Sequence, residues 1–124
     1  MSSDYYKRNQ GIITGIDNKN VIRINKSTRL RIKIEGYASG GGDRYFYRIL
    51  LLSLNNNILA VREKLNDKYY SLISVKEDDN YFYIISSFGT TMLIDISSNE
   101  NANTTYYSAS NVPESATLVE ITDL

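Results

Sequence analysis

The sequence predicts an all-β protein, either an antiparallel β-sandwich or a jelly-roll-like barrel of about ten short strands. Apolar residues recur with a period of two, the spacing of a strand with one buried face. Ile, Tyr and Thr, which favour strands, number 15, 11 and 8, whereas Ala, the best helix former, occurs five times. Short runs rich in Asn, Asp, Ser and Gly separate the apolar stretches, as turns do.

The chain of 124 residues fits one domain, predicted over residues 1–124. Leu, Ile, Val and Phe are numerous enough to form a core, and no boundary or internal repeat divides the chain. Ten strands are expected, over residues 12–16, 21–24, 29–35, 45–54, 58–65, 69–75, 81–88, 92–97, 104–107 and 117–121.

The first strands differ in how clearly they are marked. Residues 12–16 form a weak opening strand, suited to a sheet edge, and residues 21–24 a short second strand. In residues 29–35, Leu30, Ile32 and Ile34 alternate with charged residues, which predicts a half-buried strand with a basic outer face. Residues 36–42 contain four glycines and are expected to form a flexible loop. This loop lacks the Gly-Lys-Ser/Thr continuation of a phosphate-binding loop.

Residues 45–54 are apolar on both faces. Tyr45, Tyr47, Ile49 and Leu51 share one side, and Phe46, Leu50, Leu52 and Leu54 share the other, which Arg48 interrupts. Such a strand is either covered on both faces or meets another subunit. We expect Ile32, Leu50, Leu52 and Ile84 to lie in the core.

Polar turns separate the later strands. Asn55-Asn56-Asn57 predicts a hairpin turn, because Asn tolerates positive φ. Residues 66–67, 77–80 and 111–114 are expected to be turns, and residues 98–103 a polar loop. Met92, Ile94 and Ile96 alternate with Leu93, Asp95 and Ser97, and residues 117–121 are predicted as one closing strand.

The composition excludes much chemistry. The sequence has no His and no Cys, so no Ser-His-Asp triad, thiol nucleophile, zinc site of these ligands or disulfide is possible within it. No cofactor or metal is predicted, and the protein is expected not to be an enzyme. The N-terminus has no apolar signal segment, and the longest apolar run, residues 49–52, is far too short to span a membrane.

The neutral net charge hides an asymmetry. Residues 1–50 carry 10 Lys/Arg and 4 Asp/Glu, and residues 51–124 carry 4 and 10, giving +6 and −6. Either the two halves mix their charges within one chain, or the basic half faces an acidic surface of a neighbouring subunit. The candidate residues for a subunit charge contact are Arg29, Arg31, Lys33, Glu77, Asp78 and Asp79. Nucleic-acid binding by the basic strand is disfavoured, since the strand has no aromatic residue of its own.

Tyrosine supplies 11 of the 14 aromatic residues. Its flat apolar ring and polar hydroxyl suit protein interfaces and sugar stacking, and they suit a half-buried strand equally well. The candidate ligand or interface residues are Tyr37, Arg44, Tyr45, Tyr47, Tyr69, Tyr81 and Tyr83. The acidic run 77–79 lacks the spacing of a calcium loop and is interpreted as a solvated hairpin turn.

Three segments carry a resemblance. They are Asp67-Lys68-Tyr69-Tyr70, Tyr81-Phe82-Tyr83-Ile84-Ile85 and Thr91-Met92-Leu93-Ile94-Asp95-Ile96-Ser97, which follow one another with an acidic turn between the first two. This stretch resembles small β-modules of tailed-phage fibres and other virion surface proteins. The resemblance implies a non-enzymatic homo-oligomer, with a trimer favoured, located in the virion and in contact with other virion proteins. It transfers no binding residues.

Two hypotheses follow. The first is a bacteriophage structural protein, a fibre, tip or capsid-surface component that acts in assembly or in attachment to a host surface, where a glycan could be the receptor. The second is a monomeric carbohydrate-binding module. The size of the protein in solution discriminates between them, because the first expects an oligomer.

Overall fold

The computed structural model describes residues 7–14, 20–40, 43–64, 73–86, 90–99, 104–107 and 112–124. These residues form two β-sheets that pack together, and none of them is helical. All strand pairs are antiparallel except one, between the last strand and β5. The prediction of an all-β fold with a sandwich architecture is confirmed.

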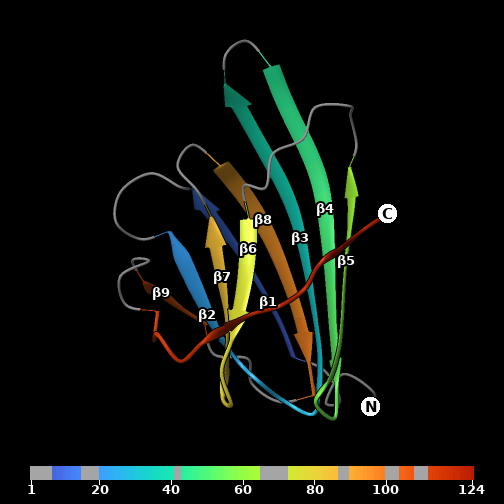
Figure 1. Ribbon diagram of the computed structural model, residues 1–124, viewed down its shortest axis with the longest axis vertical. Coiled ribbons are helices and arrows are strands. Elements are labelled where there is room, and N and C mark those ends of the chain that lie inside the picture. The colour runs from blue at the N-terminus through green and yellow to red at the C-terminus, as the bar shows by residue number, and fades with distance from the viewer. Residues whose placement is uncertain are drawn as a thin grey trace.

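The larger sheet has six strands in the order β1-β8-β3-β4-β5-β11. Their bounds are β1 Lys7–Thr14, β8 Thr90–Ser98, β3 Arg29–Gly40, β4 Asp43–Leu54, β5 Asn57–Lys64 and β11 Thr122–Asp123. Both β3 and β4 are 12 residues long, and their hairpin extends beyond the other strands (Figure 1). β1 lies at the sheet edge, where the sequence placed the opening strand, although it begins earlier than predicted.

The smaller sheet has five strands in the order β10-β6-β7-β2-β9. Their bounds are β10 Thr117–Leu118, β6 Ile73–Glu77, β7 Tyr81–Ser86, β2 Val21–Asn25 and β9 Thr104–Tyr107. The core lies between the two sheets and consists mainly of Ile side chains, joined by Phe82, Tyr47 and Met92. Ile32 and Ile84 are fully buried there, as predicted.

The β4–β5 hairpin shows how local sequence fixes a register. Asn55 and Asn56 have φ values of 49° and 69°, the left-handed conformation that Asn tolerates and that a tight hairpin turn requires. Leu54 therefore pairs with Asn57, and Leu52 pairs with Leu59. The predicted Asn turn is confirmed, and it decides which side chains of β4 and β5 stand side by side.

The prediction of a loop over residues 36–42 is wrong. β3 continues to Gly40, and β4 begins at Asp43. Gly36 is buried and pairs with Tyr47 on β4. A Cβ on Gly36 would overlap with the Cζ, Cε2 and Oη atoms of Tyr47. The glycine therefore leaves space for a buried aromatic ring to pack against the backbone of β3, and it is not a hinge.

The prediction that Leu50 and Leu52 belong to the core is also wrong. On β4, Tyr47, Ile49, Leu51 and Ser53 point inward, and the leucines between them point away from the smaller sheet. Leu50 is partly buried and Leu52 is 37% exposed. The second apolar face of β4 is therefore an outer surface of the sheet, and no third layer covers it among the described residues.

The single closing strand predicted over residues 117–121 is in fact two short strands in different sheets. β10 pairs with β6, and β11 pairs in parallel with β5. Between them the chain crosses from one sheet to the other (Figure 1, red). Val119 is buried in the core at this crossing, and its amide donates to the carbonyl of Val75 at 2.8 Å. In the described part of the chain, no helix is long and apolar enough to cross a membrane.

Candidate functional site

The surface of the larger sheet that faces away from the core is called here the outer face. Successive strands place its side chains in rows. Leu52 lies between Arg31 on β3 and Leu59 on β5, and Leu50 lies between Lys33 and Val61. The described side chains of the outer face are Leu93, Asp95 and Ser97 on β8, Arg29, Arg31, Lys33 and Glu35 on β3, Phe46, Arg48, Leu50, Leu52 and Leu54 on β4, Asn57, Leu59, Val61 and Glu63 on β5, and Thr122 on β11.

Five of these side chains form what we call the apolar patch: Leu50, Leu52, Leu54, Leu59 and Val61. Leu54 is 52% exposed and Leu59 56% exposed. Single exposed leucines are ordinary, but contiguous apolar side chains on one sheet face are typical of an interaction surface. The patch is therefore the first candidate for a functional surface.

Charged side chains border the apolar patch on two sides. Arg29, Arg31 and Lys33 follow one another along β3. At the end of the patch, Arg48 on β4 lies between Glu35 and Glu63 in the register. An apolar centre with a charged rim is the usual anatomy of a protein–protein interface.

The basic strand is partly neutralised by its own chain. Arg31 lies 3.8 Å from Asp95 and donates a hydrogen bond to Ser97 at 3.1 Å, and Lys33 lies 3.7 Å from Glu35. A hollow of about 620 Å³ opens beside Arg29, Arg31, Leu52 and Leu54. Cationic and apolar groups thus line the same depression on the outer face.

The outer side of the smaller sheet is different, because the chain covers it. Val21 and Tyr83 pack with Ala116, and Tyr81, Ile85 and Val112 surround them. The guanidinium carbon of Arg23 lies 4.1 Å from the centre of the Tyr81 ring, a cation–π contact. Segment 112–116 therefore packs against the tyrosines of β7, which act here as packing residues.

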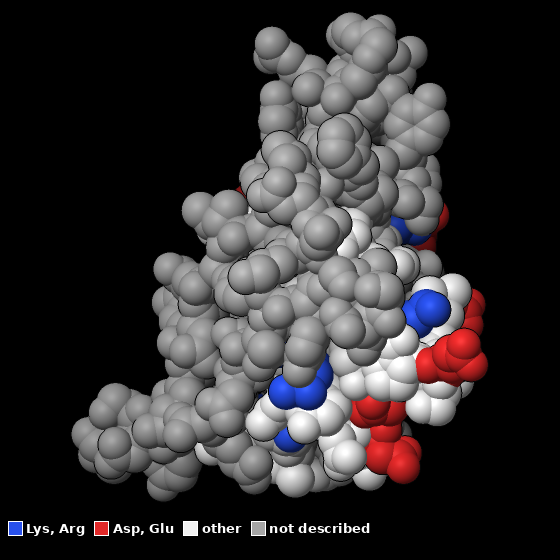
Figure 2. All heavy atoms as spheres, turned by 90° about the vertical axis from the view of Figure 1, so that its left-hand side faces the viewer, with Lys and Arg blue, Asp and Glu red and all other residues white. Residues whose placement is uncertain are grey.

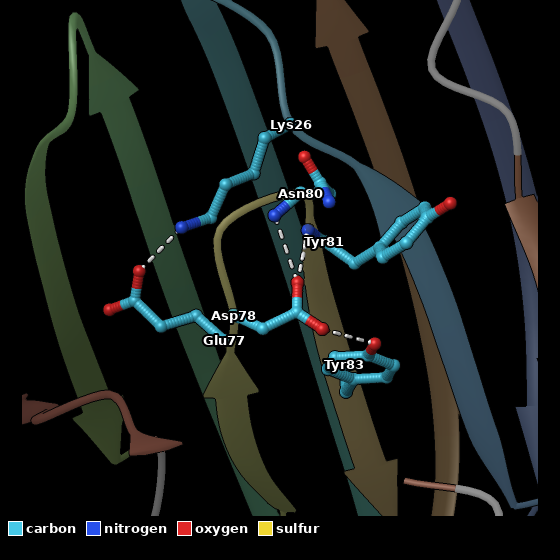
Figure 3. A network of polar contacts seen from close by, with 6 residues as sticks. All are labelled: Lys26, Glu77, Asp78, Asn80, Tyr81 and Tyr83. Carbon is cyan, nitrogen blue, oxygen red and sulfur yellow. Dashed lines mark hydrogen bonds and ion pairs between the residues drawn. The ribbon is translucent and has the colours of Figure 1, made fainter. Parts of the chain in front are cut away.

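The β6–β7 hairpin contains a polar network (Figure 3). One oxygen of Asp78 accepts hydrogen bonds from the amides of Asn80 and Tyr81, at 2.9 and 2.8 Å, and the other accepts the hydroxyl of Tyr83 at 2.7 Å. Lys26 donates to Glu77 at 2.6 Å. Both carboxylates are thus engaged within the chain, in the hairpin turn that the sequence predicts.

These contacts shift two pKa values. Burial opposes the charged form of Asp78, but the hydrogen bonds from Tyr83, Asn80 and Tyr81 and the charge of Lys26 outweigh it, so the pKa of Asp78 falls below 3.8. Burial, together with the hydrogen bond to Asp78 and its charge, raises the pKa of Tyr83 from 10.0 to about 12. The neutral phenol and the carboxylate therefore stabilise each other.

Tyr83 gives the protein a predictable alkaline response. Because its pKa is higher in the folded state than the ordinary 10.0, its contribution to stability is complete below pH 10 and is lost as the pH rises toward about 12. Urea denaturation of the wild type at a series of pH values should show the free energy of unfolding falling over this range. Tyr83→Phe should have a lower free energy of unfolding at neutral pH, and this should fall less as the pH rises. Tyr81→Phe, whose hydroxyl has no hydrogen-bond partner among the described residues, should retain the wild-type fall. An equal alkaline loss in wild type and Tyr83→Phe would contradict the assignment.

The charges of the two halves of the sequence mix in the fold. Lys26 pairs with Glu77, and Arg31 pairs with Asp95. On the side of the molecule shown in Figure 2, basic and acidic groups lie next to one another in the described part of the surface. Within the described residues, no group of three or more acidic side chains converges as metal ligands would. The subunit charge contact predicted for Arg29, Arg31, Lys33 and residues 77–79 stays a prediction.

The predicted tyrosine residues do not form one cluster. Tyr47 is 2% exposed and lies in the core, whereas Tyr81 and Tyr83 lie on the covered side of the smaller sheet. Tyr37 pairs with Phe46, Ala38 with Tyr45 and Ser39 with Arg44 in the β3–β4 hairpin; the side chains of Tyr37, Arg44 and Tyr45 lie outside the described part, as does all of Tyr69.

Sequence reasoning missed several residues of the outer face as site candidates. Arg48, Leu59, Val61 and Glu63 were not among the predicted site residues. The signal was present, since a two-residue turn at Asn55-Asn56 aligns Leu52 with Leu59, Leu50 with Val61 and Arg48 with Glu63. Extending the predicted turn into a register would have found the patch.

No family model and no curated protein matches the sequence. A solved structure with a similar fold is the crystal structure of the tailspike protein gp49 from Acinetobacter baumannii bacteriophage Fri1, a capsular polysaccharide depolymerase. The TM-score is 0.53 at 13% sequence identity, over 86% of this chain and 20% of that chain. This chain shares a β-fold with part of a phage tailspike. At this identity the likeness establishes the fold alone, and the chain spans about a fifth of the tailspike's length.

Proposed function

We propose that this chain is a non-enzymatic structural protein of a bacteriophage virion, a fibre, tip or surface component that acts in assembly or host attachment. The observation that carries the proposal is the apolar patch with its charged rim on a fold similar to part of a phage tailspike. A sheet with an apolar outer surface is suited to docking against another protein. The depolymerase activity named for the tailspike is not carried over, because the match covers 20% of that chain.

The geometry favours a docking role over the carbohydrate-binding alternative. Sugar binding by stacking requires exposed aromatic rings. Among the described aromatic residues, Tyr47 and Tyr83 are 2% and 3% exposed, Tyr81 is partly buried, and Phe46 is 38% exposed. Among the described residues, the exposed large apolar side chains are mainly leucines, which suit a protein partner. The trimer implied by the resemblance of the sequence remains a prediction.

Purified virions test this proposal directly. An antiserum against the recombinant chain should label particles of the phage that encodes it, and mass spectrometry of washed particles should detect its peptides. A host cytoplasmic protein added before purification serves as the control for carry-over. Absence of the chain from virions, together with binding of a soluble glycan by the monomer, would favour the carbohydrate-binding alternative and contradict the proposal.

A further inference from the structure

Exposed apolar side chains are concentrated on one side of the molecule. Among the described residues, seven large hydrophobic side chains are exposed, and five of them lie on the outer face: Phe46, Leu52, Leu54, Leu59 and Leu93. The patch formed by Leu50, Leu52, Leu54, Leu59 and Val61 is continuous, because its members are direct cross-strand neighbours or alternate residues of β4 and β5. A partner with a matching apolar surface would remove these leucines from water.

Two charges at the end of the patch indicate what that partner is. Arg48 and Glu63 are cross-strand neighbours on the outer face, and both are exposed. Neither makes an ion pair within the described part of the chain. At this end of the patch, the described part of the surface thus carries one positive and one negative charge beside an apolar centre, and such a surface can be complementary to a second copy of itself.

The register determines how two copies would fit. Consider a two-fold axis that lies in the interface and runs along the strands between β4 and β5. It places β4 of one copy over β5 of the other. Because the axis runs along the strands, each cross-strand pair of one copy lies over the same pair of the other copy. Leu52 then faces Leu59 of the second copy, Leu50 faces Val61, and Arg48 faces Glu63. Each of these contacts occurs twice, as in any isologous interface.

The other in-plane axis, perpendicular to the strands, is disfavoured by charge. It would lay β3 of one copy over β3 of the other and bring Arg29, Arg31 and Lys33 of both copies together. Like charges facing each other oppose association. Both axes keep the strands of the two sheets aligned, as in aligned sandwiches, so the charges are what distinguish them.

We propose that the outer face binds a second copy of this chain, with β4 and β5 of each copy packed across a two-fold axis parallel to the strands. The charges of Arg48 and Glu63 fix the orientation, and the apolar patch supplies the affinity. This inference goes beyond the proposed virion role and concerns the purified chain. The virion role is tested on particles and this interface on the purified chain, so failure of one proposal can be distinguished from failure of the other.

Sedimentation equilibrium of the full chain tests the interface. The wild type should be a dimer at micromolar concentrations, and Leu59→Asp should raise the dissociation constant by about 30-fold or more, the size of a hot-spot loss. Leu118→Asp is the matched control, since Leu118 is 67% exposed on the smaller sheet and Leu59 is 56% exposed in the patch. A wild type that stays monomeric at millimolar concentration, a trimer, or a dimer insensitive to Leu59→Asp would overturn the proposal.

Charge exchange tests the two-fold geometry itself. Arg48→Glu and Glu63→Arg should each weaken the homodimer, because like charges then face each other across the axis. An equimolar mixture of the two variants should form a heterodimer, since every facing pair is again of opposite sign. Mixing Arg48→Glu with Glu114→Arg, which changes an exposed turn residue by the same charge, is the control. It should give much less heterodimer than the first mixture, because one of its two facing pairs then has like charges. Equal association in both mixtures would exclude the Arg48–Glu63 contact and overturn the proposed axis.

Discussion

Replacing Gly36 by alanine is expected to lower the free energy of unfolding by about 3 kcal/mol, the upper part of the range for inserting a methyl group into a packed core. The new Cβ would overlap with the ring of Tyr47, which lies across the β3–β4 pair. Tyr47 is 2% exposed and is held in the main core cluster, so its ring cannot move away without displacing other core side chains. Urea denaturation of the two proteins measures the difference.

Two further variants make this prediction specific. Glu35→Ala changes the adjacent, exposed residue of β3 and should alter the free energy of unfolding by less than about 0.5 kcal/mol. Tyr47→Leu removes the ring. In that background Gly36→Ala should cause a smaller loss in the free energy of unfolding, because the two residues are in contact and their effects should not be additive. If Gly36→Ala is as stable as the wild type, the Tyr47 ring does not require a glycine at this position.

Replacing Asp78 by alanine is expected to destabilise the fold by about 3 kcal/mol, since hydrogen bonds to a charged group contribute about 1.5–3 kcal/mol each and these lie partly in water. The change removes the acceptor of the Asn80 and Tyr81 amides and of the Tyr83 hydroxyl. Tyr83 is 3% exposed, so its hydroxyl would lose this partner in a place that water reaches poorly. The β6–β7 hairpin should be the first element to lose protection in hydrogen exchange.

Asp79 provides the matched control for Asp78. It is the next carboxylate in the same turn, is exposed, and makes no hydrogen bond or ion pair with a described residue, so Asp79→Ala should cost less than about 0.5 kcal/mol. The pKa of Asp78 is below 3.8 in the folded state, so its contribution should be present above that pH and disappear as the pH falls through the lower folded value. Equal losses in Asp78→Ala and Asp79→Ala would contradict the role of the network.

Some of the candidate surface was predictable from local sequence. The alternation of Leu30, Ile32 and Ile34 with charged residues shows which side of β3 is basic, and the Asn55-Asn56 turn fixes the pairing of β4 with β5. The pairing of Leu52 with Leu59 therefore follows without a structure. The pairing of Arg31 with Leu52 does not, because the sequence predicts a loop where β3 continues to Gly40. What local sequence could not reveal was which face of β4 would be covered, because both faces are apolar and only the position of the second sheet distinguishes them.

The burial of the tyrosines, by contrast, could not be predicted from local sequence. An isolated strand pattern gives the same signal for a ring in the core, as Tyr47 is, and for a ring under a crossing segment, as Tyr83 is. Segment 112–116, which covers Tyr83, is separated from it by more than 25 residues in the chain, and no periodicity connects them. Burial that depends on such distant segments is not encoded in any short window.

The sequence alone determined that the protein is all-β, where most turns lie, and that His- and Cys-dependent chemistry is excluded, because period-two alternation, Asn turn chemistry and composition are local properties of the chain. Only the tertiary structure decided that residues 36–40 continue a strand, that the last residues divide between two sheets, and that Leu50 and Leu52 face outward. Each of these depends on a contact between residues distant in sequence: the ring of Tyr47 on Gly36, the pairing of β10 with β6 and of β11 with β5, and the packing of the smaller sheet on the opposite face of β4.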